Sequence, residues 1–379
     1  MSSAVDFSLG GVVGLRLEGA GPRELAAVSR QLGPLRRPLA GEPDVVVRFV
    51  DRLALSSPVR YIGLDDAGYT DDAFLVLRGK HKTRALLQIP FERVGSRCEL
   101  LCERGIAAVP LLVPILNLTA LGKGVLPLHA AAFVHEGVGV LATGWSKGGK
   151  TESLLAFMEQ GARYVGDEWV YLSADGGAMF GIPEPIRLWS WHLDSLPSLR
   201  ARLPRSERAR LSMLRLVTGG MGRITANGAR HGSAATRTLN RVSALLRTQL
   251  CVDLAPERLF PARNGSAGAA SERVRPDVVL FVVSHERPEI SVQPIDPRVI
   301  AERMLFSLQE EDQRLASCYH KFRFAFPERT NPVLERASEL RRAALQGALA
   351  GKRAFEVRHP YPVSLPELYQ ELRKVCVCV

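Results

Sequence analysis

Short apolar runs separated by turn-forming residues dominate the N-terminal third of the chain. Residues 45–50 and 73–77 are rich in valine, leucine and phenylalanine, and both runs predict strands. Residues 21–32 instead repeat their apolar positions at helical spacing, which predicts a helix. The pattern is typical of a small mixed α/β domain, which we assign to residues 1–122.

A different pattern begins near Leu126, where strand-like and helix-like segments alternate. Residues 138–142 are a short apolar run, residues 143–149 are rich in glycine, and residues 150–160 have helical spacing. A strand, a turn and a helix in this order are typical of the start of an α/β nucleotide-binding core. Further strands are predicted at 164–165, 170–172, 278–283 and 354–357, and further helices from 331 to about 345 and from 364 onward. We therefore expect residues 123–379 to form a second domain.

One apolar stretch, residues 106–121, could be mistaken for a membrane span. It contains Pro110, Pro114 and Asn117, and it is shorter than the ~20 residues that a bilayer requires. We expect a buried helix here, and no membrane partner.

Residues 196–272 interrupt the second domain with a strongly basic segment. Apolar positions at 211–217 and 239–246 predict amphipathic helical pieces, and glycines at 219–222, 226–228 and 264–268 predict mobile connections. Eleven arginines lie between residues 200 and 247, at positions 200, 202, 205, 208, 210, 215, 223, 230, 237, 241 and 247. We expect a helical insertion with a basic face.

The basic face has three readings. It is a solvated helical surface, a docking surface for an acidic peptide, or a nucleic-acid interface. Residues 200–247 contain no lysine and no aromatic residue, so stacking on nucleic-acid bases has no support. This observation argues against nucleic acid as a partner.

Composition agrees with a folded cytoplasmic protein that has an anionic partner. Apolar residues make up 46% of the chain, and the formal net charge is +11. Such a charge favours polyanions such as nucleotides or acidic peptides. No secretory signal opens the chain, so we expect the six cysteines to be reduced and the protein to be cytoplasmic.

The strongest chemical signal is a complete G-x-x-x-x-G-K-[ST] motif between the strand at 138–142 and the helix at 150–160. Glycines let backbone amides turn toward phosphate oxygens, and the following helix contributes its positive N-terminus. Lys150 would reach the β- and γ-phosphates, and the Thr151 hydroxyl would bind Mg²⁺. This motif is called a P-loop, and it predicts a site for Mg²⁺ and a nucleotide, ATP by default. The site would be formed by Gly144, Trp145, Ser146, Lys147, Gly148, Gly149, Lys150 and Thr151.

Two further signals flank the motif in sequence. Asp167 and Glu168 follow a predicted strand sixteen residues after Thr151, where one could hold the metal and the other accept a proton from an attacking hydroxyl. His129 lies in an apolar run before the motif. A single histidine in such a run is usually a structural core residue, so its role stays open on this reasoning.

Taken together, these motifs resemble the kinase core of HPr kinase/phosphorylase. The resemblance covers residues 126–190 and includes Leu128-His129-Ala130-Ala131, the P-loop through Glu152, and the segment 161–168. It extends weakly to residues 278–374, where the segment 360–365 is similar to the endings of distant relatives. It implies a mixed-sheet P-loop fold of the phosphoenolpyruvate carboxykinase type, and an oligomer.

The resemblance also implies roles for individual residues. Asp167 would be the general base, Thr151 and Glu168 would be metal ligands, and His129 and Glu152 would lie at the site. The family's segment that supplies a metal-binding glutamate and an arginine is absent, and Glu184 and Arg187 lie in the same region. We therefore take Glu184 as a metal ligand and Arg187 as a residue that neutralises charge. Lys147 replaces a family glycine and adds a charge beside the phosphates.

The sequence thus predicts ATP-dependent transfer of a phosphoryl group to a serine or threonine hydroxyl of a peptide or small protein. Divergent members that resemble this chain act as peptide kinases in ribosomal-peptide biosynthesis. Two alternatives remain: a kinase for a small hydroxylated metabolite, and a nucleotide-gated binding protein without catalysis. The motifs do not distinguish ATP from GTP.

Overall fold

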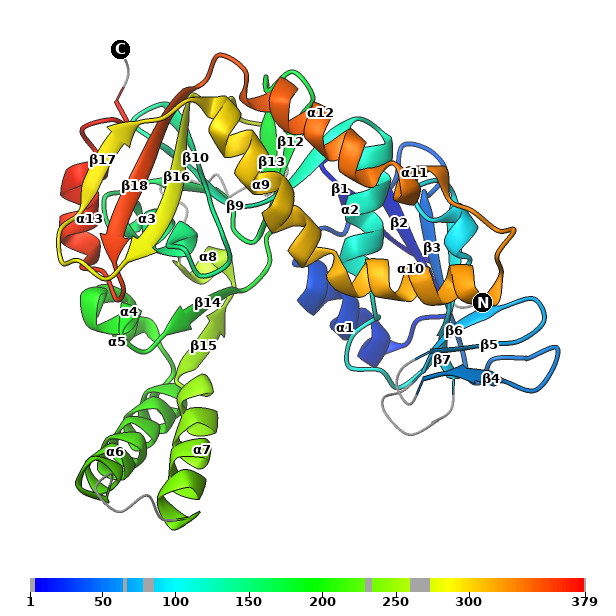
Figure 1. The fold of residues 1–379 in the computed structure, drawn as a ribbon, viewed down its shortest axis with the longest axis horizontal. Coiled ribbons are helices and arrows are strands. Elements are labelled where there is room, and N and C mark those ends of the chain that lie inside the picture. The colour runs from blue at the N-terminus through cyan, green and yellow to red at the C-terminus, as the bar shows by residue number, and fades with distance from the viewer. Residues whose placement is uncertain (1–3, 64–66, 78–84, 229–233, 260–272, 378–379) are drawn as a thin grey trace.

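The computed structural model describes residues 4–63, 67–77, 85–228, 234–259 and 273–377 (Figure 1). These residues form two mixed β-sheets with covering helices, and a helical hairpin that projects from the second sheet. The expected α/β class is therefore confirmed. None of the described helices is long and apolar enough to span a bilayer.

The first sheet has eight strands in the order β1-β2-β3-β8-β7-β6-β5-β4. β2, β3 and β8 are parallel neighbours, and the other pairs are antiparallel. The helices beside this sheet are α1 (Pro22–Leu32) and α2 (Leu112–Gly122), with a short 3₁₀ helix at Phe91–Arg93. Its strands are β1 (Val5–Leu9), β2 (Val13–Glu18), β3 (Val45–Val50), β4 (Arg60–Ile62), β5 (Ala67–Tyr69), β6 (Phe74–Leu77), β7 (Ala85–Gln88) and β8 (Cys98–Glu103).

The strands predicted at 45–50 and 73–77 and the helix predicted at 21–32 are confirmed as β3, β6 and α1. The buried helix predicted at 106–121 is confirmed only in part, because α2 begins at Leu112. Leu111 has a left-handed backbone (φ 59°), and Pro110 disfavours a helical conformation at the residue before it. Residues 106–111 are therefore a turn.

The second sheet has the order β13-β12-β9-β10-β16-β18-β17, and β11 also pairs with β9. β10, β16 and β18 are parallel, and the other pairs are antiparallel. Its strands are β9 (Val125–His135), β10 (Val138–Thr143), β11 (Arg163–Gly166), β12 (Trp169–Ser173), β13 (Met179–Gly181), β16 (Val278–His285), β17 (Ser291–Pro294) and β18 (Arg353–Pro360).

Helices cover both faces of the second sheet (Figure 1). On one face α3 (Lys150–Met158) and α13 (Leu365–Leu372) pack through Leu154, Phe157 and Leu368. On the other face α9 (Pro297–Glu311) and α12 (Ala337–Leu349) pack through a second apolar cluster. A strand buried on both faces needs a continuous apolar sequence, which explains the runs of β10 and β16.

The C-terminal part of the chain returns to the first sheet. α10 (Gln313–Ala325) follows α9 and places Phe322 against Phe74 and Phe91, with ring centroids 6.0 and 5.4 Å apart. The helix predicted from 331 to about 345 is divided into α11 (Pro332–Glu335) and α12, because the chain leaves helical geometry at Arg336 as it returns toward the second sheet. The two sheets are thus joined by a shared set of helices.

The basic insertion forms the projecting hairpin of Figure 1. The two long helices α6 and α7 pack against each other, and a two-stranded sheet of β14 and β15 joins them to the body. The elements are β14 (Ile186–Trp189), α4 (His192–Ser195), α5 (Pro197–Arg202), α6 (Arg205–Gly228), α7 (Ala234–Thr248), β15 (Cys251–Leu254) and α8 (Pro256–Leu259).

Two of the predicted mobile connections are wrong, because α6 continues through residues 219–222 and 226–228. Each glycine costs a helix about 1 kcal/mol, but the packing of α7 along α6 compensates for this local preference. The third connection, at 264–268, lies outside the described residues.

Asn331 connects the C-terminal helices to the first sheet. Its side-chain oxygen accepts hydrogen bonds from the backbone of Val333 and Leu334, which caps α11. Its side-chain amide donates to the carbonyl oxygens of Phe91 and Val94, both at 2.6 Å, and only 1% of the residue is exposed. One side chain therefore satisfies four backbone groups, of which the two carbonyl groups are in buried hydrogen bonds.

We expect Asn331→Ala to lower the free energy of unfolding by about 2–4 kcal/mol, because it leaves buried backbone groups without partners. Asp296 is the matched control, since it caps α9 at the surface through the Arg298 amide and makes no bond to the first sheet. Asp296→Ala should cost about 1 kcal/mol in the same urea titration. Equal losses in the two variants would contradict the connecting role of Asn331.

Candidate active site

Strand β9 lies between the strand that leads into the P-loop (residues 144–151) and the acidic pair, Asp167 and Glu168. On one edge of β9, Ala130 pairs with Thr143, the last residue before the P-loop. On the other edge, the Ala130 amide donates to the carbonyl oxygen of Glu168 at 3.1 Å, and His129 pairs with Trp169. Segments far apart in the sequence are therefore brought to the same two residues of β9.

The P-loop needs glycine where the chain is tightest. Gly149 has a φ of 110°, and a Cβ there would lie 1.9 Å from Nε2 of His359. Gly144 has a φ of 155°, and its Cβ would lie 2.4 Å from the carbonyl oxygen of Val282. Val282 on β16 and His359 on β18 thus pack against the loop, and they leave no room for a side chain at Gly144 or Gly149.

The Lys150 side chain lies across the loop. Its Nζ donates to the carbonyl oxygens of Gly144 and Trp145, at 3.3 and 2.9 Å. An ammonium group has three donors, so one remains for an incoming oxyanion. Burial lowers the pKa of Lys150, and the surrounding carboxylates partly offset this effect. Trp145, Ser146 and Lys147 are exposed at the tip of the loop.

Thr151 and Asp167 meet directly. The Thr151 hydroxyl lies 3.2 and 3.1 Å from the two carboxylate oxygens of Asp167. Asp167 is only 3% exposed. Burial and the charge of Glu168 raise the pKa of Asp167 to about 7, although the hydrogen bond from Thr151 acts in the opposite direction. A carboxyl group with such a pKa can accept a proton near neutral pH.

Glu168 has a left-handed backbone conformation. Its φ is 66°, and Asp167 and Glu168 form a bend between β11 and β12. In this bend the two adjacent side chains reach different partners: Asp167 meets Thr151, while the Glu168 carboxylate lies 3.0 Å from Nε2 of His129. An unfavourable backbone conformation at such a position is typical of functional sites.

His129 lies between two carboxylates. Its Nδ1 is 2.6 Å from Oε1 of Glu311, at the end of α9, although this ion-pair contact does not have the geometry of a hydrogen bond. Burial lowers the pKa of His129, but Glu168 and Glu311 outweigh burial and raise it. The contact with His129 lowers the pKa of each carboxylate. The two acids therefore favour the charged form of the imidazole.

Glu184 contributes a third acid near the loop. It lies between β13 and β14, and its Oε1 is buried without a hydrogen-bond partner among the described residues. Burial and the charges of Glu168 and Asp167 raise the pKa of Glu184 to about 8. Arg187, which we expected to neutralise charge, pairs with Asp253 on β15 at 2.9 Å and interacts electrostatically with Glu168.

The donor set at the loop suits a hard divalent cation. Asp167, Glu168, Glu184 and the Thr151 hydroxyl offer only oxygen, which Mg²⁺ prefers. Within the described part of the chain, no three acidic, histidine or cysteine side chains are arranged to hold a metal by themselves. Mg²⁺ is usually bound by one or two carboxylates together with phosphates and water, and the buried unpaired oxygen of Glu184 fits that requirement.

Glu152, expected at the cofactor site, points away from the loop mouth. Its carboxylate lies 3.1 Å from Nε2 of His192 on α4, and the backbone amide of Trp189 donates to the other ring nitrogen. Burial acts to raise the pKa of Glu152, but His192 lowers it overall. This contact connects the P-loop helix α3 to the base of the hairpin.

Sequence reasoning missed two residues of the site, Glu311 and His359. His359 is fully buried on β18, and its Nε2 lies 2.9 Å from the carbonyl oxygen of Gly148. Neither residue belongs to a motif, and each lies more than 150 positions after the loop. The only local signal was that His359 follows closely on the strand predicted at 354–357.

The structure therefore brings together Lys150, Thr151, Asp167, Glu168 and His129, with Glu184 close enough to interact electrostatically. Neither known protein families nor curated protein sequences contain a match to this chain. The site is consequently argued from its own geometry.

Substituting the high-pKa acids should stabilise the chain at alkaline pH. Between about pH 4 and pH 8 the folded state binds more protons at Asp167 and Glu184 than the unfolded state, so stability falls as pH rises through this window. Asp167→Asn and Glu184→Gln should each raise the free energy of unfolding by about 1–3 kcal/mol at pH 8 and much less at pH 4. Denaturant titrations at both pH values measure the difference.

The control is Glu310→Gln, which removes an exposed carboxylate beside Glu311. It should not reproduce the pH-dependent gain. A gain for Asp167→Asn that is equal at pH 4 and pH 8 would show that the carboxyl group does not titrate as described.

Proposed function

We propose that the protein is an ATP-dependent kinase that phosphorylates a serine or threonine hydroxyl of a peptide or small protein. The observation that carries this proposal is the direct contact of Thr151, on the P-loop helix, with the buried carboxyl group of Asp167. It places a group able to accept a proton beside a loop whose amides, lysine and helix N-terminus suit phosphate. Kinase chemistry needs this combination.

The strand arrangement supports a P-loop core like that of HPr kinase and phosphoenolpyruvate carboxykinase. The P-loop strand β10 has an antiparallel neighbour, β9, and a parallel neighbour, β16. The resemblance noted in the sequence implies such a mixed sheet.

In the proposed reaction the loop and Lys150 bind the triphosphate. Thr151 would hold Mg²⁺ together with Glu168 or Glu184, and the ion would neutralise phosphate charge. Asp167 accepts the proton of the acceptor hydroxyl. His129 and Glu311 hold the Glu168 carboxylate in place. Positioning and electrostatics supply most of the rate enhancement in reactions of this type.

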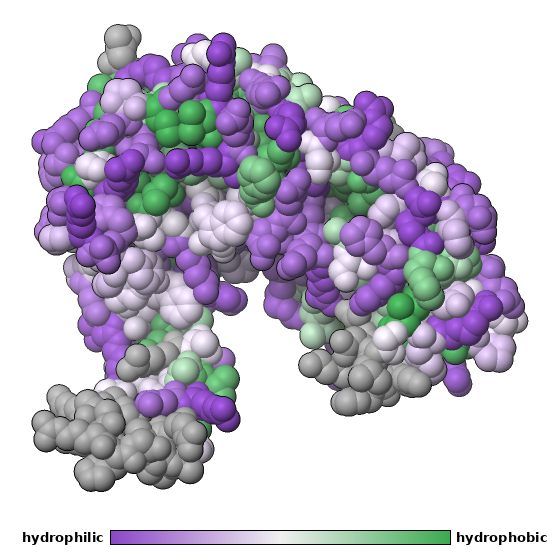
Figure 2. Space-filling model, viewed as in Figure 1, coloured by the Kyte–Doolittle hydropathy of each residue, from purple (hydrophilic) through white to green (hydrophobic). Residues whose placement is uncertain are grey.

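The hairpin favours a peptide or protein acceptor over a small metabolite. Apolar side chains are exposed along one face of α6 and on α7, with Leu216 78% and Leu245 67% exposed. The body is hollowed between the hairpin and the first sheet (Figure 2). Exposed apolar residues beside arginines suit an acidic amphipathic segment. The exposed apolar residues are Met213, Leu216, Val217, Val242 and Leu245.

Substitutions at the loop should separate binding from transfer. Lys150→Ala should weaken nucleotide binding at least tenfold in calorimetry, because it removes the cation that faces the phosphates. Asp167→Asn should retain nucleotide binding but lose 10²–10⁴-fold in transfer of label from γ-labelled ATP to serine-containing acidic peptides. Lys374→Ala and Asp175→Asn remove exposed charges and should change neither measurement.

The outcomes discriminate between the candidate functions. Unchanged nucleotide binding by Lys150→Ala would refute the phosphate-binding loop. Nucleotide binding without transfer to peptides or hydroxylated metabolites, by wild type and Asp167→Asn alike, would favour the nucleotide-gated binding protein. Transfer to small hydroxylated compounds alone would favour the metabolite kinase.

The hairpin should contribute to acceptor binding and not to chemistry. Leu216→Gln with Leu245→Gln should raise KM for acidic serine-containing peptides several-fold, and leave kcat and nucleotide affinity unchanged, because both side chains are exposed. Phe324→Gln is the matched control, since Phe324 is 72% exposed on α10, which packs on the first sheet. An equal effect of both changes would show that the hairpin has no specific role.

A further inference from the structure

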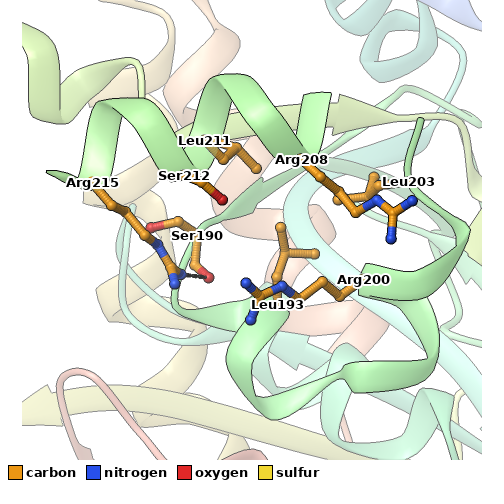
Figure 3. Close-up of a pocket in the computed structure, with 8 residues that line it drawn as sticks. All are labelled: Ser190, Leu193, Arg200, Leu203, Arg208, Leu211, Ser212 and Arg215. Carbon is orange, nitrogen blue, oxygen red and sulfur yellow. Dashed lines mark hydrogen bonds between the residues drawn. The ribbon is translucent and has the colours of Figure 1, made fainter. Parts of the chain in front are cut away.

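A cavity at the base of the hairpin is lined by three arginines from three directions. Arg200 lies on α5, and Arg208 and Arg215 lie on α6 (Figure 3). Ser190 and Ser212 add hydroxyl groups to the lining. The floor is apolar and buried, and it consists of Leu193, Leu203 and Leu211. The cavity is small and partly open to solvent.

The arginines are only partly neutralised within the described part of the chain. Arg215 makes two 2.9 Å bonds to the carboxylate of Asp194 and also donates to the Ser190 carbonyl oxygen. Arg200 reaches the same carboxylate at a weak 3.5 Å. Arg208 has no partner among the described residues. Arg200 and Arg215 thus share one carboxylate, and Arg208 has none.

This arrangement leaves donors available to an anion. The side chains of Arg200 and Arg215 are 52% and 34% exposed, so solvent screens the repulsion between the guanidinium groups. The unused donors also include the hydroxyl groups of Ser190 and Ser212, which have no partner in the described residues. Ser190 is 9% exposed, so it is shielded from bulk solvent. A bound anion would satisfy both the charge and the donors.

The size and geometry restrict the anion. Guanidinium groups bind the oxygens of phosphate in pairs of hydrogen bonds, which a single carboxylate can match only once. The cavity is too small to enclose a nucleotide or another drug-sized ligand. A single phosphoryl group, with its remaining substituent directed to solvent, fits these limits.

We propose that this cavity is a binding site for a phosphoryl group, either inorganic phosphate or a phosphate monoester, separate from the P-loop. The two sites are joined through α4, which carries Asp194 at the cavity and His192 beside Glu152 of α3. The proposed site does not depend on kinase activity, because none of its residues contacts the loop.

The test uses the full chain with Lys150→Ala, so that phosphate does not also bind at the P-loop. Calorimetry with inorganic phosphate and with N-acetyl-phosphoserine amide should detect one saturable site. Adding Arg208→Gln, which removes an unpaired donor, or Ser212→Asp, which introduces a like charge for the anion, should weaken binding at least tenfold. The matched control is Arg205→Gln, an exposed arginine of α6 outside the cavity, which should retain binding.

The two ligands distinguish the sources of the phosphoryl group. Tighter binding of the phosphoserine compound identifies a phosphorylated peptide as the ligand, and tighter binding of phosphate identifies the free ion. Absence of binding by both refutes the site. Equal weakening by Arg205→Gln and Arg208→Gln also refutes it, because this result would indicate general attraction to a basic surface. Circular dichroism establishes that each variant is folded.

Discussion

The pairing of β9 on both edges is the constraint on which the candidate site depends. A strand can hold only two neighbours, and the neighbours of β9 at His129 and Ala130 are the strand that leads into the P-loop and the bend that carries Asp167 and Glu168. Backbone hydrogen bonds set these positions, so the sheet fixes the spacing between the P-loop and the side chains of Asp167 and Glu168. The Thr151 contact with Asp167 follows from this register, because α3 starts directly after the loop.

The same geometry places acids where burial and neighbouring negative charges disfavour their ionised form. Asp167 and Glu184 are buried near Glu168, which raises the pKa of both acids, whereas His129 stabilises the charged form of Glu168. Replacing such acids would favour folding but remove the groups that can bind a cation or accept a proton. Natural sites often retain unfavourable groups of this kind because function requires them. The acid-rich side of the loop and the lysine across it are complementary parts of one arrangement.

The rest of the chain supports this centre from three sides. The first sheet lies against the loop that carries Glu184, where a Cβ at Gly33 would come within 2.1 Å of the Pro183 carbonyl oxygen. Helix α10 ties that sheet to the chain that follows Glu311. The hairpin is joined to α3 by the contact of Glu152 with His192. The first sheet and the hairpin therefore each contact a segment that carries a residue of the site or its helix.

The sequence by itself determined the α/β class and located the glycine-rich motif and the acidic pair, because each rests on local patterns: apolar periodicity, glycine spacing and adjacent carboxylates. It also placed several of the strands and helices. Only the tertiary structure decided that Glu311 and His359 belong to the site, that Glu152 faces α4, and that α6 runs through its glycines. These features depend on strand order and on packing between segments far apart in the chain. No local pattern of residues carries that information, because the contacts exist only once β9, β16 and β18 lie in one sheet.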